Sequence, residues 1–560
     1  MKQEIARDPS RGHSHLQVSS LPFSEIPHQS RLFLEYLSDP LSLDNYYPNV
    51  LSSPAQATAF VPQVLAEYQT DRRELCRALG QINSEIGAGE KTFENLRLLG
   101  EKGTVAVVTG QQAGLFTGPL YTLYKALSAV SLAEKLSREG TNAVPVFWAA
   151  TEDHDFDEVS EGYFVGETGA LSQYEYSPKE YVKNSPVGDV LLDGDIGSIV
   201  DDLFRELPDT EFSKEMREQL MLAWSPGTRF GLAFQTTLAG LLGRFGVVYI
   251  DPTNEAIKRL GSAIYAKAIS RSDEIVANVM RRSEELVTAG FHAQVLVEND
   301  HFPLFWHDDA GRRLALRKTA EGTFRAKGDK REFTRSELEQ LAMDEPDRLS
   351  PGVMLRPVVQ DYLLPTVCYF GGAAEIAYFA QNSEVYRLLG RPVTPIFHRQ
   401  SFTIVEAKQR RVLDKLGLQF QEMFAGADET RLRIAEQELS PETAAAFDEV
   451  DKRMREDLSQ LERRLSQISP TLVANLIKRR PKMLYHVATL RKKALAALAD
   501  RDEVVSGQLE NAFASLLPNG ELQERSLNVF GFLNKFGPKL INWIYEAIDL
   551  DDKGHRIINL

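Results

Sequence analysis

The segment of the sequence with the most potential for chemistry is 151–158 (TEDHDFDE), where five carboxylates surround His154. It follows directly after the apolar run 144–148 (VPVFW). Like charges at this density oppose one another's ionisation unless something positive balances them. We therefore expect the segment to have a function, or a cationic neighbour that the sequence alone does not reveal.

Three interpretations of this segment remain open. First, His154 and Asp155 could bind a substrate amino group or act as acid and base. Second, Asp153, His154 and Asp155 could bind a divalent metal. Third, the acidic residues could simply begin a helix, where the helix dipole favours them. The first interpretation makes His154, Asp155 and Asp153 the candidate catalytic residues, with Glu152 as a binding residue and no metal.

A glycine-bearing loop, 109–118 (TGQQAGLFTG), is the second candidate site. It lies between a predicted strand and a predicted helix, where backbone N–H groups can approach an anion such as phosphate or carboxylate. It matches neither GxGxxG nor GxxxxGK[ST], so it does not indicate NAD or P-loop chemistry. The alternative is that the glycines only permit a tight turn. The candidate binding residues are Thr109, Gly110, Gln111, Gln112, Gly114 and Gly118.

The third cluster lies in 355–366 (LRPVVQDYLLPT) and the following 370–381 (FGGAAEIAYFAQ). Arg356 could hold a carboxylate in a bidentate fork. The alternative is an internal salt bridge between Arg356 and Asp361. The other candidate binding residues here are Gln360, Gly372, Glu375 and Tyr378.

Alternating strands and helices are predicted to position these three clusters. Short apolar runs are typical of buried parallel strands, and the stretches between them repeat their apolar residues at helical spacing. We expect a doubly wound α/β sheet of the Rossmann type, with ligands beyond the carboxyl ends of its strands. The predicted strands are 104–109, 144–148, 246–250, 366–370 and 393–397, with helices from about 119 to 140, 229 to 244 and 373 to 389.

Two segments, at about 160–225 and 290–345, interrupt this alternation and are predicted to be insertions. Beyond Arg399 the strands are expected to stop. The apolar residues from Phe447 to Leu472 advance by three or four positions, which predicts a helical hairpin or antiparallel coiled coil about 40 Å long. We therefore expect a core at 1–400 and a helical domain at 401–560. The coiled coil could form a homodimer or pack on its own chain.

Composition narrows the class of protein. The 560 residues carry 64 Lys and Arg against 79 Asp and Glu, a formal charge of −15. This balance argues against a protein that coats nucleic acid or an anionic membrane. The two cysteines form no CxxC pair, the first 20 residues lack the apolar core of a signal peptide, and no long apolar run occurs. We expect a cytoplasmic protein that does not enter the membrane.

In combination, these motifs resemble a known family. The segments VVTGQQAGLFTGPLYTLYK, VPVFWAATEDHDFDE, LRPVVQDYLLPT and FGGAAEIAYFAQ, with the closing FLNKFGPKLINWIYEAI, are similar to the BshC family of cysteine ligases in bacillithiol biosynthesis. The resemblance extends from the N-terminal region to the end of the chain.

The resemblance implies a Rossmann core with connecting-peptide insertions and a coiled-coil domain that supports a homodimer. It also implies that L-cysteine is added to the glucosamine amine of glucosaminyl-malate, which would be the last step of bacillithiol synthesis. ATP is expected from the ligase activity, although the sequence has neither HxGH nor KMSKS. The alternative is a nucleotide- or sugar-binding regulatory protein with a degenerate synthetase-like core.

Overall fold

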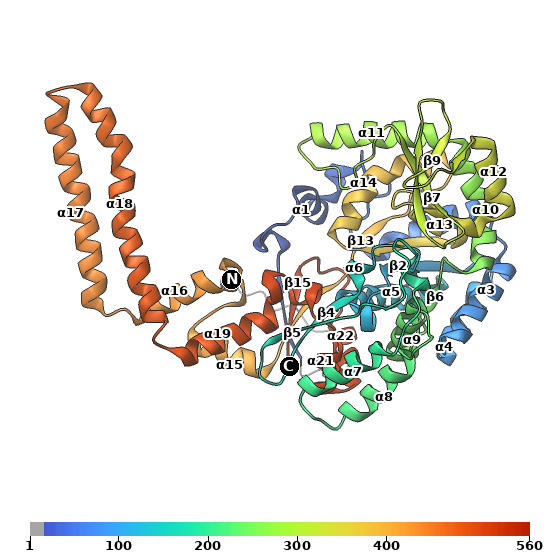
Figure 1. Ribbon diagram of the computed structural model, residues 1–560, viewed down its shortest axis with the longest axis horizontal. Helices are drawn as coiled ribbons and strands as arrows, with labels where there is room; N and C mark the ends of the chain where they lie inside the picture. The colour runs from blue at the N-terminus through green and yellow to red at the C-terminus, as the bar shows by residue number, and fades with distance from the viewer. Residues whose placement is uncertain (1–15) are drawn as a thin grey trace. The chain divides into compact units, whose positions relative to one another are not determined.

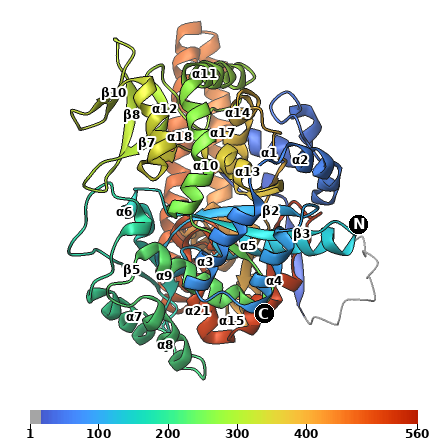
Figure 2. The same cartoon turned by 90° about the vertical axis from the view of Figure 1, so that its right-hand side faces the viewer.

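The computed structural model describes residues 16–560. They form two compact units. The first comprises the described chain up to Ile404 together with Leu522–Leu560, and the second is Val405–Glu521. Figures 1 and 2 show the elements of both units, coloured along the chain.

The first unit is built on a five-stranded parallel sheet with strand order β13-β12-β2-β3-β6. Of these five strands, β2 comes first in the sequence and lies in the middle of the sheet. The chain then forms β3 and β6 on one side of β2, and β12 and β13 on the other. This is the Rossmann arrangement, with its switch point between β2 and β12. The strands are β2 (Val105–Gln112), β3 (Ala143–Ala150), β6 (Val248–Ile250), β12 (Thr366–Gly371) and β13 (Ile396–His398).

Helices connect these strands as predicted. The α5 helix (Tyr121–Arg138) joins β2 to β3 and packs against both, with most of its residues buried. The α9 helix (Phe230–Leu242) precedes β6, and α14 (Ala373–Leu388) joins β12 to β13. Because β2 and β3 are covered on both faces, the first four residues of β2 and nearly all of β3 are buried and apolar. The predicted α/β fold class is confirmed.

Two further groups of elements interrupt the alternation. The first contains the β4–β5 hairpin (Glu161–Val165 and Leu171–Glu175) and the helices α7 (Asp195–Glu206) and α8 (Ser213–Ala223). The second is an antiparallel sheet of order β10-β9-β8-β7-β11 with helix α12 (Arg335–Asp344). Its strands are β7 (His301–His307), β8 (Arg313–Lys318), β9 (Phe324–Ala326), β10 (Glu332–Phe333) and β11 (Leu349–Pro351).

Several helices surround the main sheet. Those before β2 are α1 (Arg31–Ser38), α2 (Val61–Glu67), α3 (Arg72–Glu85) and α4 (Glu90–Leu99). Those between β6 and β12 include α10 (Glu255–Ser270), α11 (Ser272–Thr288) and α13 (Arg356–Leu363). The side chain of Asn254 caps α10 by accepting from the N–H groups of Ala256 and Ile257, as helix N-termini require.

The prediction that strands stop at Arg399 is wrong. A three-stranded sheet of order β1-β15-β14 joins the start, the end and the middle of the chain through β1 (Gln17–Leu21), β14 (Ser401–Val405) and β15 (His555–Asn559). Each strand is too short, and its partners too distant in sequence, for periodicity to reveal it.

The closing segment also departs from the predicted division at residues 400 and 401. Residues from Leu522 onward belong to the first unit, with α20 (Gln523–Ser526), α21 (Phe530–Phe536) and α22 (Lys539–Glu546). The physical cause is a buried ion pair: Arg399 donates to Glu524 at 2.8 Å, and Glu524 also accepts from Ser401 and from the Phe402 N–H.

The second unit is helical. The predicted hairpin is formed by α17 (Pro441–Ser466) and α18 (Pro470–Ala499), and the Ser469 side chain caps α18 by accepting from the Thr471 N–H. The α18 helix continues through Pro481, although a proline inside a helix normally breaks or kinks it. The unit also contains α15 (Ala407–Leu416), α16 (Ala427–Glu438) and α19 (Glu503–Leu516).

None of the helices in residues 16–560 combines the length and apolar character of a membrane span. Most of the polar start of the chain, on which the expectation about a signal peptide rests, lies outside the described residues. Cys76 and Cys368 are both free thiols, and Cys368 is buried in β12.

Candidate functional site

The candidate site lies at the carboxyl edge of the parallel sheet, where β2 ends in polar residues and polar residues directly follow β3. Gln111 and Gln112 are consecutive at the end of β2, so their side chains leave the strand on opposite faces. Gln111 joins a cluster at the switch point, and Gln112 joins the acidic segment 151–158. The end of β2 therefore links two groups of polar side chains.

The first group is centred on a buried ion pair that crosses the switch point. Lys125, from α5, contacts Glu375, from the first turn of α14, at 2.5 Å. The Lys125 ammonium also donates to the Gly110 carbonyl at 3.0 Å and to Gln111 Oε1 at 2.9 Å. Burial lowers the pKa of Lys125, and the adjacent Glu375 carboxylate opposes that effect. Lys125 is therefore an internal cation, with its charge paired inside the protein.

Glu375 holds the start of α14 in place. Its carboxylate accepts from the Gly372 N–H at 2.6 Å, as in a capping box, and from the Tyr369 hydroxyl at 2.7 Å. With Lys125 included, three donors satisfy this carboxylate. Glu375 and Gly372 are therefore at the predicted place, but the Glu375 carboxylate is occupied by protein groups.

Arg356, at the start of α13, has an unfilled hydrogen-bonding position. One guanidinium nitrogen donates to Gln360 Oε1 at 2.9 Å, while the other, Nη2, is buried and has no partner among the described residues. The guanidinium lies over the rings of Trp148 and Tyr369, with 5.8 and 5.5 Å to the ring centroids. The Tyr378 hydroxyl oxygen accepts a further hydrogen bond from the guanidinium. A cation held this way has capacity for one more acceptor, such as a carboxylate or phosphate oxygen.

Gln360 and Asp361 lie behind Arg356 and are buried. Asp361 accepts from Gln360 at 2.9 Å, from Thr394 at 2.6 Å and from the Tyr386 hydroxyl. Burial raises the pKa of Asp361, and these hydrogen bonds act in the opposite direction. In the part of the chain that the structure describes, Arg356 reaches Asp361 only through Gln360, so the alternative of a direct salt bridge between them is not found.

The glycine loop is shaped by packing. A Cβ atom on Gly114 would lie 2.8 Å from the Gly118 Cα atom, and Gly118 has a φ of +68°. The Asn528 side chain donates to the carbonyls of Phe116 and Gly118 at 2.8 and 2.9 Å, which fixes the turn from the closing segment. Gly114 and Gly118 are buried, so in this structure they serve the turn, as the alternative interpretation has it.

Two other residues predicted in this loop are also internal. The Thr109 hydroxyl donates to the Phe370 carbonyl at 2.8 Å, which ties β2 to β12. Gly110 is buried, and a side chain does not fit there because a Cβ atom would lie 2.9 Å from the Trp148 carbonyl oxygen. Of the six loop candidates, only Gln111 and Gln112 keep partial exposure.

The second group is the acidic segment itself, which β3 delivers to the same edge. Gln112 donates to Asp153 at 2.7 Å and to Glu158 at 2.9 Å. Burial acts to raise the pKa of Asp153, but the charge of Arg313 and hydrogen bonds from Gln112 and from the backbone N–H of His154 hold that pKa below its usual range. Asp153 is therefore a structural anion in this arrangement.

Glu152 has a buried cationic partner that the sequence did not reveal. Lys258, from α10, pairs with Glu152 and also donates to the Leu349 carbonyl at 2.5 Å. Burial raises the pKa of Glu152, and Lys258 opposes the shift. The pair links the end of β3 to α10 and β11, so the Glu152 carboxylate is occupied by a cation of the protein itself.

His154 and Asp155 have accessible side chains, as do Asp157 and Glu158 further along the segment. The His154 side chain is 33% exposed, and its Nδ1 atom lies 3.0 Å from Nη1 of Arg313. Asp155 is exposed, and within residues 16–560 its carboxylate forms no hydrogen bond or ion pair. The side chains of His154 and Asp155 are therefore accessible, while Asp153, the third predicted catalytic residue, accepts from Gln112 and from the His154 backbone N–H.

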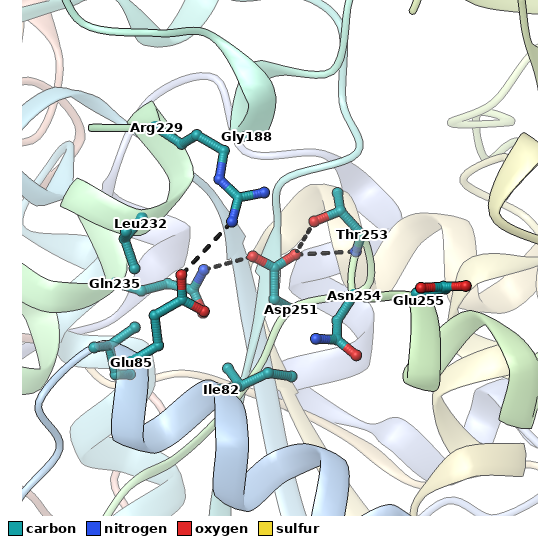
Figure 3. A pocket seen from close by; sticks show the side chains of 11 residues that line it. Ile82, Glu85, Gly188, Arg229, Leu232, Gln235, Asp251, Thr253, Asn254 and Glu255 are labelled. Carbon is teal, nitrogen blue, oxygen red and sulfur yellow. Dashed lines mark hydrogen bonds and ion pairs between the residues drawn. The ribbon is translucent and has the colours of Figure 1, made fainter. Parts of the chain in front are cut away.

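A pocket of about 280 Å³ lies beyond the carboxyl end of β6, and Asp251, Gln235 and Thr253 are among the residues that line it (Figure 3). Asp251, which follows β6, accepts from the Thr151 hydroxyl at 2.6 Å, from Gln235 at 2.8 Å and from the Thr253 hydroxyl at 2.7 Å. Arg229 lies 3.6 Å from Glu85 at the side of the pocket. The volume of the pocket and its three carboxylates, from Glu85, Asp251 and Glu255, suit a small molecule that carries an ammonium group.

Lys258 and Arg313 are the important residues that the sequence did not single out. Lys258 lies in an ordinary amphipathic helix and Arg313 in a hairpin strand, so neither has a local signal. His307 ends β7, where it contacts Ser350 at 2.9 Å. Within residues 16–560, no group of three or more His, Cys, Asp and Glu side chains is arranged to hold a metal ion.

Comparison with known proteins gives a consistent result. Residues 16–400 match the model of the bacillithiol biosynthesis BshC N-terminal Rossmann-like domain, and residues 402–560 match that of the BshC C-terminal coiled-coil domain. Two relatives carry the name "Putative cysteine ligase BshC". The one from Salinibacter ruber is 33% identical, with 94% of this chain and 96% of that protein covered. The one from Solibacter usitatus is 34% identical, with 96% and 98% covered. The chain therefore belongs to the BshC family of bacillithiol biosynthesis.

Proposed function

We propose that this protein is a cysteine ligase that joins the carboxyl group of L-cysteine to the glucosamine amine of glucosaminyl-malate. This amide bond would complete bacillithiol. Family membership over nearly the whole chain supports the proposal, and none of the described features favours a regulatory binding protein.

The observation that carries the proposal is the unfilled Nη2 atom of Arg356. A buried guanidinium with an unpartnered donor is costly unless a ligand oxygen completes it. Its place beside the switch point is where Rossmann sheets bind their ligands. A malyl carboxylate of the acceptor substrate would satisfy Arg356 in a fork that a lysine could not reproduce.

Amide formation from a free carboxylate is unfavourable in water, so the cysteine carboxyl group must be activated. We propose that ATP supplies this activation. The unfilled position of Arg356 also fits a phosphate oxygen, so the residues present are compatible with a nucleotide at the switch point.

The acidic segment is proposed to act on the attacking amine. Only the free amine is a nucleophile, so its proton must be removed. The exposure of His154 and Asp155 supports this role, and the hydrogen bond from Gln112 to Asp153 holds the segment in shape. Loss of the group that accepts the proton is expected to reduce turnover about 10²-fold or more.

The test is direct synthesis. Purified protein is incubated with cysteine, glucosaminyl-malate and ATP, and bacillithiol is followed by mass spectrometry. AMP with pyrophosphate among the products indicates an adenylate, whereas ADP with phosphate indicates an acyl phosphate. Failure to form bacillithiol under any combination of nucleotide and metal contradicts the proposal.

Arg356→Lys and Arg356→Gln provide the matched variants. Both are expected to raise KM for glucosaminyl-malate by 10-fold or more, because a bidentate charge-assisted contact is lost. A substitution at Arg453, which lies in the α17 helix, serves as the control and should leave KM unchanged.

We further propose that the protein is a homodimer formed through the α17–α18 hairpin. Part of the apolar stripe of the hairpin is exposed, although apolar side chains normally gather where a partner covers them. The exposed members include Val450, Leu461, Ile468, Leu472, Ile477 and Leu490.

Sedimentation of the wild type and of Leu461→Asp with Ile468→Asp tests the dimer. The double variant is expected to sediment as a monomer with unchanged helical content. If the wild type itself sediments as a monomer at micromolar concentration, the proposal is wrong.

We place the enzyme in the cytoplasm. Its two cysteines are free thiols, and its proposed substrate is a thiol that a reducing compartment preserves. Fractionation of cells that express the protein without an added targeting sequence would test this location.

A further inference from the structure

Arg313 is held in one orientation by the elements around it. Its Nε atom donates to the Ser350 hydroxyl at 2.9 Å, and Nη2 donates to the Pro351 carbonyl at 3.0 Å. The guanidinium also lies 3.7 Å from the centroid of the Phe305 ring. The side chain is 8% exposed. Three contacts on three sides leave Arg313 little freedom, so the direction of its remaining N–H groups is fixed.

The remaining guanidinium nitrogen, Nη1, lies 3.0 Å from Nδ1 of His154. Arginine has only donors, so Nδ1 must be the acceptor in this contact. A neutral imidazole with an unprotonated Nδ1 carries its proton on Nε2. The other tautomer would bring two N–H donors to within 3.0 Å of each other. Asp153 Oδ1 is more distant from Nδ1, at 3.5 Å, and it already accepts the backbone N–H of His154 at 2.8 Å.

The neighbouring groups fit the same direction of donation. The Ser350 hydroxyl accepts from Arg313, so its own proton is available to His307 Nε2 at 2.9 Å. Burial and the nearby cations Lys258, Arg313 and Arg348 lower the pKa of His307, which keeps that ring neutral and able to accept. Donation therefore runs outward from the buried arginine to both histidines.

We infer that Arg313 is a positioning residue that keeps the proton of His154 on Nε2, so that His154 donates a hydrogen bond to an oxygen of the reacting acyl group. This inference rests on the proposed ligase function. A ring whose Nδ1 is occupied by a cation and whose Nε2 already carries a proton has no free nitrogen for the proton of the amine. His154 therefore stabilises developing negative charge, and the role of base belongs to the exposed carboxylate of Asp155.

The step balances with this assignment. The amine nitrogen attacks the acyl carbon of ATP-activated cysteine and forms the C–N bond, while negative charge grows on the acyl oxygen. His154 Nε2–H donates to that oxygen. The activating group then leaves with the electrons of its C–O bond, and the amine proton passes to Asp155.

The tautomer is tested first, without any substrate. In protein labelled with [15N]histidine, the signal that disappears in His154→Gln is expected to show an unprotonated Nδ1 and a protonated Nε2. In Arg313→Gln the same residue should become a mixture of tautomers. A protonated Nδ1 in the wild type overturns the inference, whether or not the protein is a ligase.

The roles are then tested by activity. Glutamine keeps an N–H donor near the position of Nε2, whereas leucine does not. His154→Gln is therefore expected to retain at least 10-fold more turnover than His154→Leu, in line with the 10²- to 10³-fold cost of losing one oxyanion donor. Asp155→Asn should lose about 10²-fold or more. Equal loss in His154→Gln and His154→Leu, with full activity in Asp155→Asn, would make His154 the base and overturn the inference. Absence of ligase activity in every form would instead refute the proposed function and leave the tautomer result standing.

Discussion

Ion pairs at the carboxyl edge of the parallel sheet differ in burial from those of the α17–α18 hairpin. The side chains of Lys125 and Glu375 are 4% and 17% exposed, whereas those of Arg453 and Glu449 are 73% and 49% exposed. The residue types are similar in both regions. Burial therefore decides which charges hold the fold together, because a buried charge without its partner is far more costly than a solvated one.

The comparison also explains the distribution of the negative charge. The five carboxylates of the acidic segment do not form a uniform anionic surface. Glu152 is neutralised by Lys258, and Asp153 lies 3.7 Å from Arg313. In the hairpin, by contrast, carboxylates such as Asp451 and Glu449 pair with arginines one turn away and remain in water.

The largest effect is expected from Lys258→Met. This substitution leaves the Glu152 carboxylate buried and unpaired, which should reduce the free energy of unfolding by about 3 to 5 kcal/mol. Chemical denaturation followed by circular dichroism measures it. The double variant Lys258→Met with Glu152→Leu should recover much of the loss, because neither charge then remains. A loss below about 1 kcal/mol in the single variant would show that water reaches this pair.

The second effect is a dependence of stability on pH in the sheet that the closing segment completes. His555 is fully buried, and burial, assisted by Arg399 and opposed by Glu524, lowers its pKa to about 4. Between pH 6.5 and 4 the unfolded chain binds a proton that the folded chain does not. Stability should therefore fall as the pH is lowered through this range, by about 3 kcal/mol from His555 alone.

Unfolding of the wild type and of His555→Gln at pH 7 and pH 4.5 measures this contribution. The variant should lose less stability on acidification than the wild type. Equal losses would mean that His555 is protonated in the folded protein. The solvated hairpin offers no comparable buried histidine in α17 or α18, so melting confined to that hairpin should be less sensitive to this range of pH.

The third effect concerns the link between the glycine loop and the closing segment. Asn528→Ala removes two hydrogen bonds to the carbonyls of Phe116 and Gly118 and leaves both buried. The expected cost is about 1 to 3 kcal/mol. Asn528→Asp is the matched control: it keeps the size but replaces the donating amide with an acceptor, so it should be at least as destabilising. Unchanged stability in Asn528→Ala would mean that packing alone fixes the loop.

The sequence predicted the features that local pattern controls. The apolar runs of β2, β3 and β12 and the repeating stripe of α17 each carry their own signal, and the order of strands and helices implied the Rossmann sheet. The capping role of Ser469 could be predicted because a cap depends on its immediate neighbours.

Contacts between distant segments could not be predicted. Arg313 reaches His154 across 159 residues, and Lys258 reaches Glu152 across 106. The strand β1, near the start of the chain, pairs with β15, near its end. A single sequence contains no trace of such proximity, so the cations that balance the acidic segment could be expected but not named.

The smallest effect is expected from the solvated ion pairs of the α17–α18 hairpin. Glu449→Gln removes the partner of Arg453 one turn along α17, and both side chains are mostly exposed. Because such i,i+4 pairs contribute about 0.3 to 0.5 kcal/mol and are screened by salt, the variant should unfold within that margin of the wild type. Added salt should reduce the difference further, whereas the loss in Lys258→Met should persist because the buried pair is screened much less. A loss above 1 kcal/mol in Glu449→Gln at moderate salt would show that this face of the hairpin is covered, which is the outcome expected if the partner subunit of a dimer packs on it.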